Sequence, residues 1–395
     1  MLLKNCRLPD GKVKDIEIKE GKIINIKENI ETTYPVDKII DIKNNLTIPG
    51  IIDPHCHFRE PGMTHKEDLH TGSKSTAAGG ITTFFDMPNT EPPTTTNKLL
   101  EEKRELGKKS ITNYGFHFGA ASDNIHEIKK AKNIASTKLF MNITTGKLLI
   151  ENEKDIKNVF LASKTVSVHA EEEMVERAIK FSKATEKKLY LCHISTKNEL
   201  EIIKKHKDKN IFAEVTPHHL FLNQSKDKDN FTKMKPPLRT EEDRLALWKA
   251  IESGLIDTIG TDHAPHTIKE KNQKETIFGV PGCETMLPLM LNEVNKGNIT
   301  IQKLIELCCH KPAEIFGIKN KGRLEKGYDA DITIIDLDKE TTIQGNKLFT
   351  KCKWSPFEGL KLKGKPVMTI INGNLVFVDG QINETKKGKE VVFYG

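Results

Sequence analysis

Two histidines separated by one residue are the first side chains whose spacing could do chemistry. His55 and His57 follow a mostly apolar run, residues 47–52, which predicts one buried parallel strand. Residues i and i+2 of a strand point to the same face, so both imidazoles would aim at one point beyond the strand end. Two neutral imidazoles at one point can chelate a divalent metal, and zinc fits such ligands best. An isolated His-x-His also arises when one ring packs in the core and the other is solvated.

More polar groups follow other apolar segments of the chain. One segment runs into the residues Asp86-Met87-Pro88-Asn89-Thr90, and later ones end at His169, at His193, at His218-His219 and at Asp262. Taken singly, a buried histidine is more often a satisfied core residue than a ligand, and an aspartate can cap a helix. Histidines at several strand ends, with an aspartate at the last, are difficult to explain by packing. A fold that brings these ends together would form a metal site.

Lys138 is unusual because it stands inside an otherwise apolar strand segment, Lys138-Leu139-Phe140-Met141. A charged lysine in a buried strand carries a large desolvation cost, and an ammonium cannot coordinate a metal. The side chain could be neutral, paired with an acid, or extended so that its ammonium reaches water. Addition of CO2 would instead make it an anionic carbamate whose two oxygens could bridge two metals. The residues alone leave these four alternatives open.

The segments that must position these residues alternate between strands and helices. Apolar strand segments after the first are predicted at 81–86, 114–119, 137–142, 165–169, 189–193, 211–215 and 256–261. Helical patterns are predicted at 97–107, 123–132, 171–183, 197–207 and 241–253, the last with a capping box of Thr240 and Asp243. Counting the strand before His55, the pattern predicts an α/β fold with eight β/α units. This is a (β/α)8 TIM-like barrel, with its active residues at the carboxyl ends of the strands.

The two ends of the chain have a different pattern. Short strands are predicted at 12–18, 22–27, 38–42, 330–337, 366–371 and 375–378, separated by turns such as Asn372-Gly373 and Asp379-Gly380. Two β-rich ends around a different middle predict a small β-rich subdomain formed by both termini. We therefore expect residues 1–50 and 321–395 to form this subdomain, and residues 51–320 to form the barrel.

Composition excludes several classes of function. The net charge of the 395 residues is +7, but lysines are spread along the chain and mixed with glutamates, which predicts a solvated surface and no nucleic-acid partner. The sequence has no apolar stretch of about 18 residues and no signal-peptide core, so we expect no membrane partner and a cytoplasmic location. The seven cysteines show neither zinc-ribbon nor disulfide spacing, as is typical of a reducing compartment.

In combination, these motifs resemble the dihydroorotases of the amidohydrolase superfamily. The resemblance extends over nearly the whole chain, and three motifs carry it: His55-Cys56-His57-Phe58-Arg59-Glu60-Pro61-Gly62, Asp86-Met87-Pro88-Asn89-Thr90 and Thr261-Asp262-His263-Ala264-Pro265-His266. It implies two zinc ions per chain. The implied ligands are His55, His57 and Asp262 for the first ion, His169 and His193 for the second, and a carboxylated Lys138 that bridges both.

The resemblance also implies a substrate and its contacts. Dihydroorotases cyclise N-carbamoyl-L-aspartate to L-dihydroorotate, reversibly, in de novo pyrimidine (UMP) biosynthesis. A zinc-activated hydroxide would attack the ring amide, with Asp262 as general acid and base. The residues that match contacts of the substrate are Arg59, Asn89 and His266 around its carboxylate and Phe278-Gly279 along a backbone contact. Lys235 stands where many bacterial relatives have Asn and the animal domain has Arg, so we expect a cationic role for it.

Within the family, the animal-type enzymes are the most similar. The short interval from His169 to His193 and the lysine bridge resemble the dihydroorotase domain of animal pyrimidine-synthesis polyproteins, whereas many bacterial relatives have a longer interval and an aspartate bridge. Animal-type enzymes can hold a third zinc near the residues that match Cys192, Glu214 and His219. The sequence leaves open whether these three bind a metal here or support neighbouring ligands.

Other assignments stay open at the level of sequence. Hydantoinases, dihydropyrimidinases and allantoinases share the expected fold and metals but act on neutral rings, so an arginine that binds a carboxylate argues against the first two. Allantoinase is harder to exclude. A non-catalytic subunit that only supports a partner enzyme would typically lose metal ligands, and all six expected ligand positions are kept. The sequence also leaves open a homo-oligomer and an association with aspartate transcarbamoylase.

Overall fold

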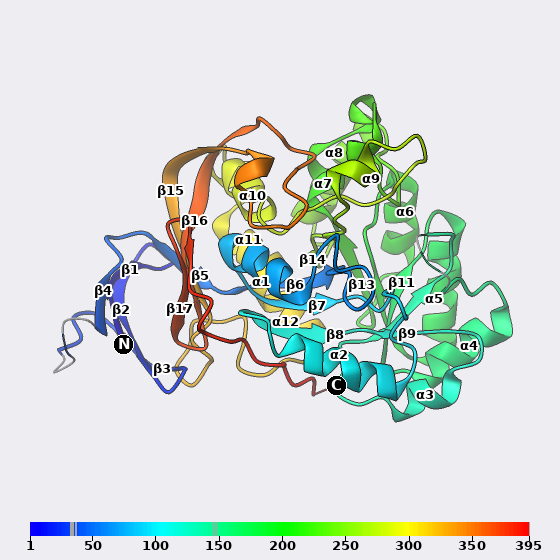
Figure 1. Ribbon diagram of the computed structural model, residues 1–395, viewed down its shortest axis with the longest axis horizontal. Helices are drawn as coiled ribbons and strands as arrows, with labels where there is room; N and C mark the ends of the chain where they lie inside the picture. Colours follow the sequence, from blue (N-terminus) through cyan, green and yellow to red (C-terminus); the bar gives the residue numbers. More distant parts are fainter. Residues whose placement is uncertain (32–34, 36–37, 145, 147, 395) are drawn as a thin grey trace.

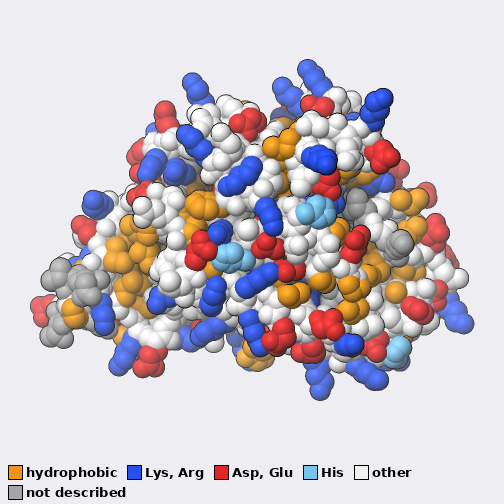
Figure 2. Space-filling model, viewed as in Figure 1, with side chains coloured by type: hydrophobic (Ala, Val, Ile, Leu, Met, Phe, Trp, Pro, Cys, Tyr) orange, Lys and Arg blue, Asp and Glu red, His pale blue; other side chains and the backbone are white. Residues whose placement is uncertain are grey.

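The computed structural model describes residues 1–31, 35, 38–144, 146 and 148–394. A barrel of parallel strands, surrounded by helices, lies beside a separate sheet that both ends of the chain build, to the left of the barrel in Figure 1. On the face drawn in Figure 2, lysine and arginine side chains alternate with aspartates and glutamates, as expected for a solvated surface.

The barrel contains eight strand positions in two hydrogen-bonded groups. The first group is β6 (Ile51–Cys56), β7 (Ile81–Asp86) and β8 (Asn113–Phe116). The second is β9 (Phe118–Gly119), β10 (Thr137–Phe140), β11 (Thr165–His169), β12 (Lys188–Leu191), β13 (Ile211–Val215) and β14 (Thr258–Ile259). β8 and β9 occupy one position, and a parallel bridge between Cys56 and His263 connects β6 to the segment after β14. The predicted barrel is confirmed.

The helices cover the outside of the barrel. They are α1 (Leu69–Ala78), α2 (Asn97–Gly107), α3 (Ile125–Lys130), α4 (Glu153–Ala162), α5 (Glu173–Thr185), α6 (Lys197–His206), α7 (Pro217–Phe221), α8 (Glu241–Glu252), α9 (Ile268–Lys271), α10 (Met286–Asn295), α11 (Ile301–Ile305) and α12 (Lys311–Ile315), with a π-helical turn at Glu306–His310. The predicted capping box of α8 is present, because the side chains of Thr240 and Asp243 each accept a hydrogen bond from the other residue's backbone N–H. Such caps satisfy amide groups that have no partner within the helix.

Both ends of the chain contribute to one nine-stranded sheet. Its strands are β1 (Leu2–Arg7), β2 (Val13–Lys19), β3 (Lys22–Lys27), β4 (Ile39–Asp41), β5 (Leu46–Pro49), β15 (Ile332–Thr342), β16 (Lys361–Ile371), β17 (Asn374–Val378) and β18 (Gln381–Ile382). The antiparallel pairing of β5 with β15 joins the two ends. The predicted β-rich region of both termini is confirmed, whereas the division at residues 50 and 320 stays a prediction.

One predicted strand is wrong. The apolar run 47–52 is not a single parallel strand but is divided at Gly50 between β5, which is antiparallel to β15, and β6 of the barrel. The sequence shows no polar break between the two strands because both are buried. At Gly50 the chain passes so close to Thr82 that an added Cβ would lie 2.2 Å from its hydroxyl oxygen. The predicted strand 114–119 is likewise interrupted at His117, whose Nε2 hydrogen-bonds the carbonyl of Pro54 at 2.9 Å.

All seven cysteines lie among the described residues, are buried and form no disulfide. Within the described ranges, no helix has the length and apolar character needed to cross a membrane.

Candidate active site

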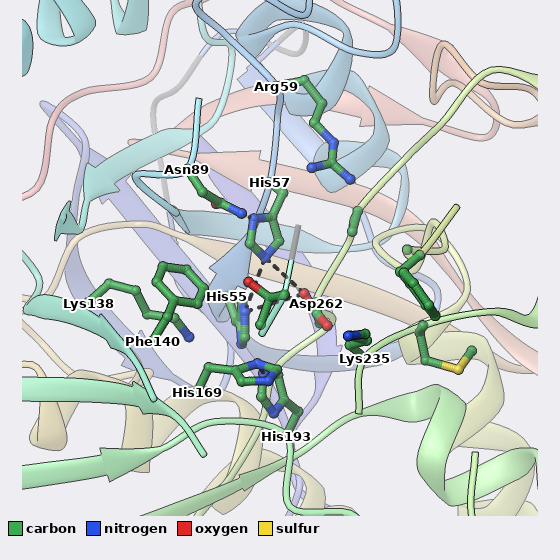
Figure 3. Close-up of a pocket in the computed structure, with 15 residues that line it drawn as sticks. His55, His57, Arg59, Asn89, Lys138, Phe140, His169, His193, Lys235 and Asp262 are labelled. Carbon is green, nitrogen blue, oxygen red and sulfur yellow. Dashed lines mark hydrogen bonds and ion pairs between the residues drawn. The ribbon is translucent and has the colours of Figure 1, made fainter. Parts of the chain in front are cut away.

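Three of the expected metal ligands converge at the carboxyl ends of the first and last barrel strands (Figure 3). Oδ1 of Asp262 lies 2.9 Å from Nε2 of His57 and 3.3 Å from Nε2 of His55. The two Nε2 atoms are 3.3 Å apart. Two imidazole nitrogens and a carboxylate oxygen therefore surround one point, which is a typical zinc ligand set.

The hydrogen bonds made by Nδ1 of His55 and of His57 determine which nitrogen of each ring can bind a metal. Nδ1 of His55 lies 2.8 Å from Oε1 of Glu214, and Nδ1 of His57 lies 2.8 Å from Oδ1 of Asn89. Both oxygens only accept hydrogen bonds, so each Nδ1 carries a proton, and each Nε2 is the nitrogen that can bind a metal. Metal-binding histidines are commonly oriented in this way. The residues present thus fit a divalent metal.

Burial and charge act differently on the two rings. Burial lowers the pKa of His57 to about 4, so its ring is neutral near pH 7 and can act as a ligand. At His55 burial also lowers the pKa, but the negative charges of Glu214 and Asp262 raise it above its usual value. The same carboxylates would attract a metal cation in place of that proton.

A second pair of histidines lies beside the first. Nδ1 of His169 is 2.9 Å from Nε2 of His193, and the rings of His55 and His193 are 5.4 Å apart between centroids. Burial lowers the pKa of both His169 and His193, so both rings are neutral. Nδ1 of His193 is buried and has no hydrogen-bond partner among the described residues. A buried nitrogen without a partner is costly, and a bound metal would satisfy it.

Lys138 lies in β10 and is 1% exposed, so its amine does not reach bulk water. Nζ donates to Sγ of Cys192 at 3.0 Å and lies 5.2 Å from the centre of the Phe140 ring. Among the described residues, no carboxylate forms an ion pair with it. Of the four alternatives, pairing with an acid and extension into water therefore do not fit these contacts.

Three residues of the site have a backbone conformation that is unusual for residues with a side chain. The φ angles are 63° at Arg59, 40° at His193 and 45° at Asp262. A positive φ outside glycine costs of order 1–3 kcal/mol each and persists where the surroundings impose it. Arg59, His193 and Asp262 all line the same cavity. The packing of this region therefore overrides the backbone conformation that each of these residues prefers.

The residues expected at a substrate carboxylate also lie together. Nε of Arg59 donates to the carbonyl of Pro265 at 3.1 Å, and Nη2 lies 3.1 Å from Nε2 of His266. Arg59 is 4% exposed, and no carboxylate among the described residues forms an ion pair with it. Burial lowers its pKa to about 10, which still leaves it charged near pH 7. A buried guanidinium without a direct ion-pair partner favours an anionic ligand.

The remaining expected residues border the same space. A cavity of about 40 Å³ is lined by His55, His57, Arg59, Asn89, Lys138, Phe140, Thr144, His169, His193, Met234, Lys235, Asp262, Ala264, Phe278 and Gly279. His266 does not line this cavity, but it contacts Arg59, which does. Nζ of Lys235 donates to the carbonyl of Ile143 at 2.9 Å and lies 4.9 Å from the centre of the Phe278 ring.

The residues of the suggested third metal site do not all meet. Cys192 and Glu214 lie close to His55, but both ring nitrogens of His219 are occupied elsewhere, by Thr216 at 2.8 Å and by the carbonyl of Pro236 at 3.1 Å. In addition to His55, Glu214 accepts hydrogen bonds from the backbone N–H of His193 at 3.0 Å and from the hydroxyl of Tyr190 at 2.8 Å. Glu214 therefore supports the histidines around it.

One buried ion pair that was not predicted from the sequence positions the site. Nζ of Lys103 lies 2.6 Å from Oδ2 of Asp86, and neither side chain is exposed. Oδ1 of Asp86 accepts a hydrogen bond from the backbone N–H of Phe58 at 2.6 Å, and Lys103 also donates to the carbonyl of Met87 at 2.8 Å. The pair thus fixes the two segments that carry His57 and Asn89. The sequence signal for this pair was Asp86, a charged residue at the end of a buried strand that needs a partner.

Comparison with known proteins identifies relatives along nearly the whole chain. Residues 46–376 match the amidohydrolase family. A dihydroorotase of Methanosphaera stadtmanae is 41% identical over 97% of both chains, and one of Pyrococcus furiosus is 39% identical over 96% of this chain and 92% of the relative. Among solved structures, an L-hydantoinase (dihydropyrimidinase) from Arthrobacter aurescens has a TM-score of 0.92 at 29% identity, with 99% of both chains covered.

Proposed function

The chain belongs to the amidohydrolase family, and we propose that it is a dihydroorotase, which interconverts N-carbamoyl-L-aspartate and L-dihydroorotate in pyrimidine biosynthesis. The observation that carries the proposal is the position of Arg59. Its buried guanidinium has no ion-pair partner among the described residues and lies beside the cluster of His55, His57 and Asp262. The site thus combines metal ligands with a place for an anion, and dihydroorotate has both a ring amide and a carboxylate.

We propose two zinc ions at this site. His55, His57 and Asp262 would hold one ion and His169 and His193 the other, with Lys138 as a carbamate between them. The carbamate would form when the free amine attacks CO2 and one proton is released. The burial of Nζ, with no ion-pair partner among the described residues, supports this assignment. Bound zinc would supply a Lewis acid for the ring carbonyl and lower the pKa of a bound water.

The chain's own residues would orient the substrate and move its proton. The planar fork of Arg59, with His266 and Asn89, would bind the carboxylate and fix the reacting amide beside the metal ligands. Asp262 would accept a proton from the attacking water and donate it to the ring nitrogen as the amide C–N bond breaks. In the cyclisation direction the same groups would act in reverse, and water is released. Phe278, Gly279 and Lys235 would border the ring.

The main alternative is hydrolysis of an uncharged ring, because one of the similar solved structures is an L-hydantoinase. A ring without a carboxylate would leave Arg59 buried and without an anion, which is unfavourable. A cytoplasmic location, which the composition predicts, belongs to the same proposal, as do a homo-oligomer and an association with aspartate transcarbamoylase.

The Arg59→Met variant tests the assignment. We expect kcat/KM for L-dihydroorotate to fall by roughly 10³-fold or more, because the site loses the group that pairs with the carboxylate, whereas the zinc content stays the same. Arg244→Met is a matched control, since Arg244 pairs with Glu241 on the outside of the barrel. Unchanged kinetics for dihydroorotate in a folded Arg59→Met protein would reject the assignment.

A further inference from the structure

Lys66 contacts His266, one of the residues proposed to bind the carboxylate, and has no role of its own in the proposed mechanism. It belongs to the segment between Arg59 and α1, and its side chain is 14% exposed. Its Nζ lies 3.3 Å from Nδ1 of His266 and 3.2 Å from Oε1 of Glu270. The ammonium is therefore held between a carboxylate and the imidazole of His266.

The contacts of His266 determine where its proton lies. At Nδ1 the ring meets the ammonium of Lys66, which only donates, and at Nε2 it meets the carbonyl of Phe278 at 2.9 Å, which only accepts. A neutral ring therefore accepts at Nδ1 and carries its proton on Nε2. Burial, together with the positive charges of Arg59, Lys66 and Lys271, holds the pKa of His266 well below its usual value, so the ring is neutral.

This arrangement makes Arg59 and His266 two donors that face one position. Nη2 of Arg59 lies 3.1 Å from Nε2 of His266. Because both nitrogens carry hydrogens, they cannot bond each other. A carboxylate oxygen placed between them would accept from Nη2 of Arg59 and share the Nε2 proton of His266 with the carbonyl of Phe278. Arg59, Lys66 and His266 also line a cavity of about 630 Å³, which shares Arg59 and Asn89 with the smaller cavity at the metal ligands. An anion in the larger cavity would therefore have access to both donors.

We propose that Lys66 is a positioning residue for the substrate carboxylate: it holds the proton of His266 on Nε2, so that His266 and Arg59 donate to the same anion. The identity of this substrate rests on the proposed function. Glu270 places the ammonium, because it accepts from Lys66 with one oxygen and caps α9 through the backbone N–H of Thr267 with the other.

The test compares three lysine variants. In Lys66→Met only the carbonyl of Phe278 still holds the proton of His266 on Nε2, and Nδ1 can instead donate to Glu270, whose Oε2 lies 3.9 Å away. We therefore expect KM for L-dihydroorotate to rise about tenfold while kcat changes little. Lys66→Arg keeps a cationic donor and should restore most of the affinity. Lys351→Met is a matched control, because Lys351 holds the same segment through the carbonyl of Thr64 at 2.6 Å and through Asp68 at 3.2 Å but does not contact His266.

Two readouts separate this role from loss of local structure. First, Lys66→Met should add nothing in a His266→Ala background, since the lysine acts through that ring. Second, the charged groups that face His266 are Arg59, Lys66, Glu270 and Lys271. Removing one of the three cations raises the pKa of His266. Burial, the largest cause of the low pKa, still keeps the ring neutral in Lys66→Met, so the KM defect should be the same at about pH 6 and about pH 8.

Binding of orotate, measured by calorimetry, gives a readout that does not depend on turnover. We expect weaker binding to Lys66→Met than to the wild type or to Lys351→Met. An equal effect of Lys66→Met and Lys351→Met, an unchanged KM and orotate affinity, or an undiminished effect in the His266→Ala background would overturn the inference. Weakened orotate binding in a protein that does not turn over dihydroorotate would support the role of Lys66 and reject the proposed function.

Discussion

Glu214 accepts a hydrogen bond from Nδ1 of His55 at 2.8 Å, and this contact leaves Nε2 of His55 facing His57 and Asp262. The carboxylate fixes both the orientation of the ring and the nitrogen that carries its proton. Because both groups are buried, water cannot replace the contact. The relationship explains how a glutamate outside the expected set of ligands would control the metal site.

Replacing Glu214 tests this relationship. In Glu214→Gln the amide keeps the size of the side chain but loses its charge, so we expect metal affinity to fall about 10–100-fold. Competition with a chelator measures the change. Tyr190→Phe is the matched control, because it removes a contact to the other oxygen of Glu214 and leaves His55 bonded. Equal metal affinity in Glu214→Gln and the wild type would show that the contact does not orient a ligand.

Replacing Lys138 tests the carbamate. Without a bridging anion two zinc ions would repel each other, so Lys138→Ala should lose at least one zinc and most of its activity. A short carboxylic acid added to the variant should restore part of the rate by occupying the gap. Normal metal content and kcat in Lys138→Ala would make the lysine structural.

Elemental analysis tests the number of metals. The ligand set predicts about two zinc ions per chain in protein purified without chelator, and removal with EDTA should abolish turnover. The melting temperature should fall as well, since a metal that binds only the folded state stabilises it. Readdition of zinc should restore both properties, and full activity in a metal-free preparation would contradict the two-metal site.

The buried pair of Lys103 and Asp86 gives a prediction for stability. Lys103→Met leaves the carboxylate of Asp86 buried without its cation, which should lower the free energy of unfolding by about 3–5 kcal/mol. Denaturant unfolding measures the change. Lys108→Met, which breaks an exposed pair with Glu105 on the same helix, should have little effect. Equal stabilities of the two variants would contradict the role of the pair.

The ligand cluster could be predicted because it depends on local periodicity and on topology. His55 and His57 share a direction at the end of β6, and the alternation of strands and helices places the end of β14, with Asp262, at the same barrel rim. The direct approach of the two Nε2 atoms agrees with that reasoning. The metals themselves and the role of each ligand stay predictions.

Other features could not be predicted because they depend on partners distant in the sequence. Lys103 lies in a helix rich in charged residues and would be expected in solvent, yet it is fully buried because Asp86 ends a strand beneath it. The apolar run around Gly50 does not reveal that its halves join different sheets. Similarly, His219 follows a strand end like the expected ligands, but its ring is satisfied by Thr216 and Pro236.

The most direct test of the proposed activity is a panel of four rings, offered to the wild-type enzyme at equal concentration: L-dihydroorotate, dihydrouracil, hydantoin and allantoin. Because a ring without a carboxylate would leave the buried guanidinium of Arg59 without an anion, we expect kcat/KM for dihydroorotate to exceed the others by as much as about 10⁴-fold. Cyclisation of N-carbamoyl-L-aspartate by the same preparation should accompany this preference. Faster turnover of dihydrouracil, hydantoin or allantoin than of dihydroorotate would contradict the assignment.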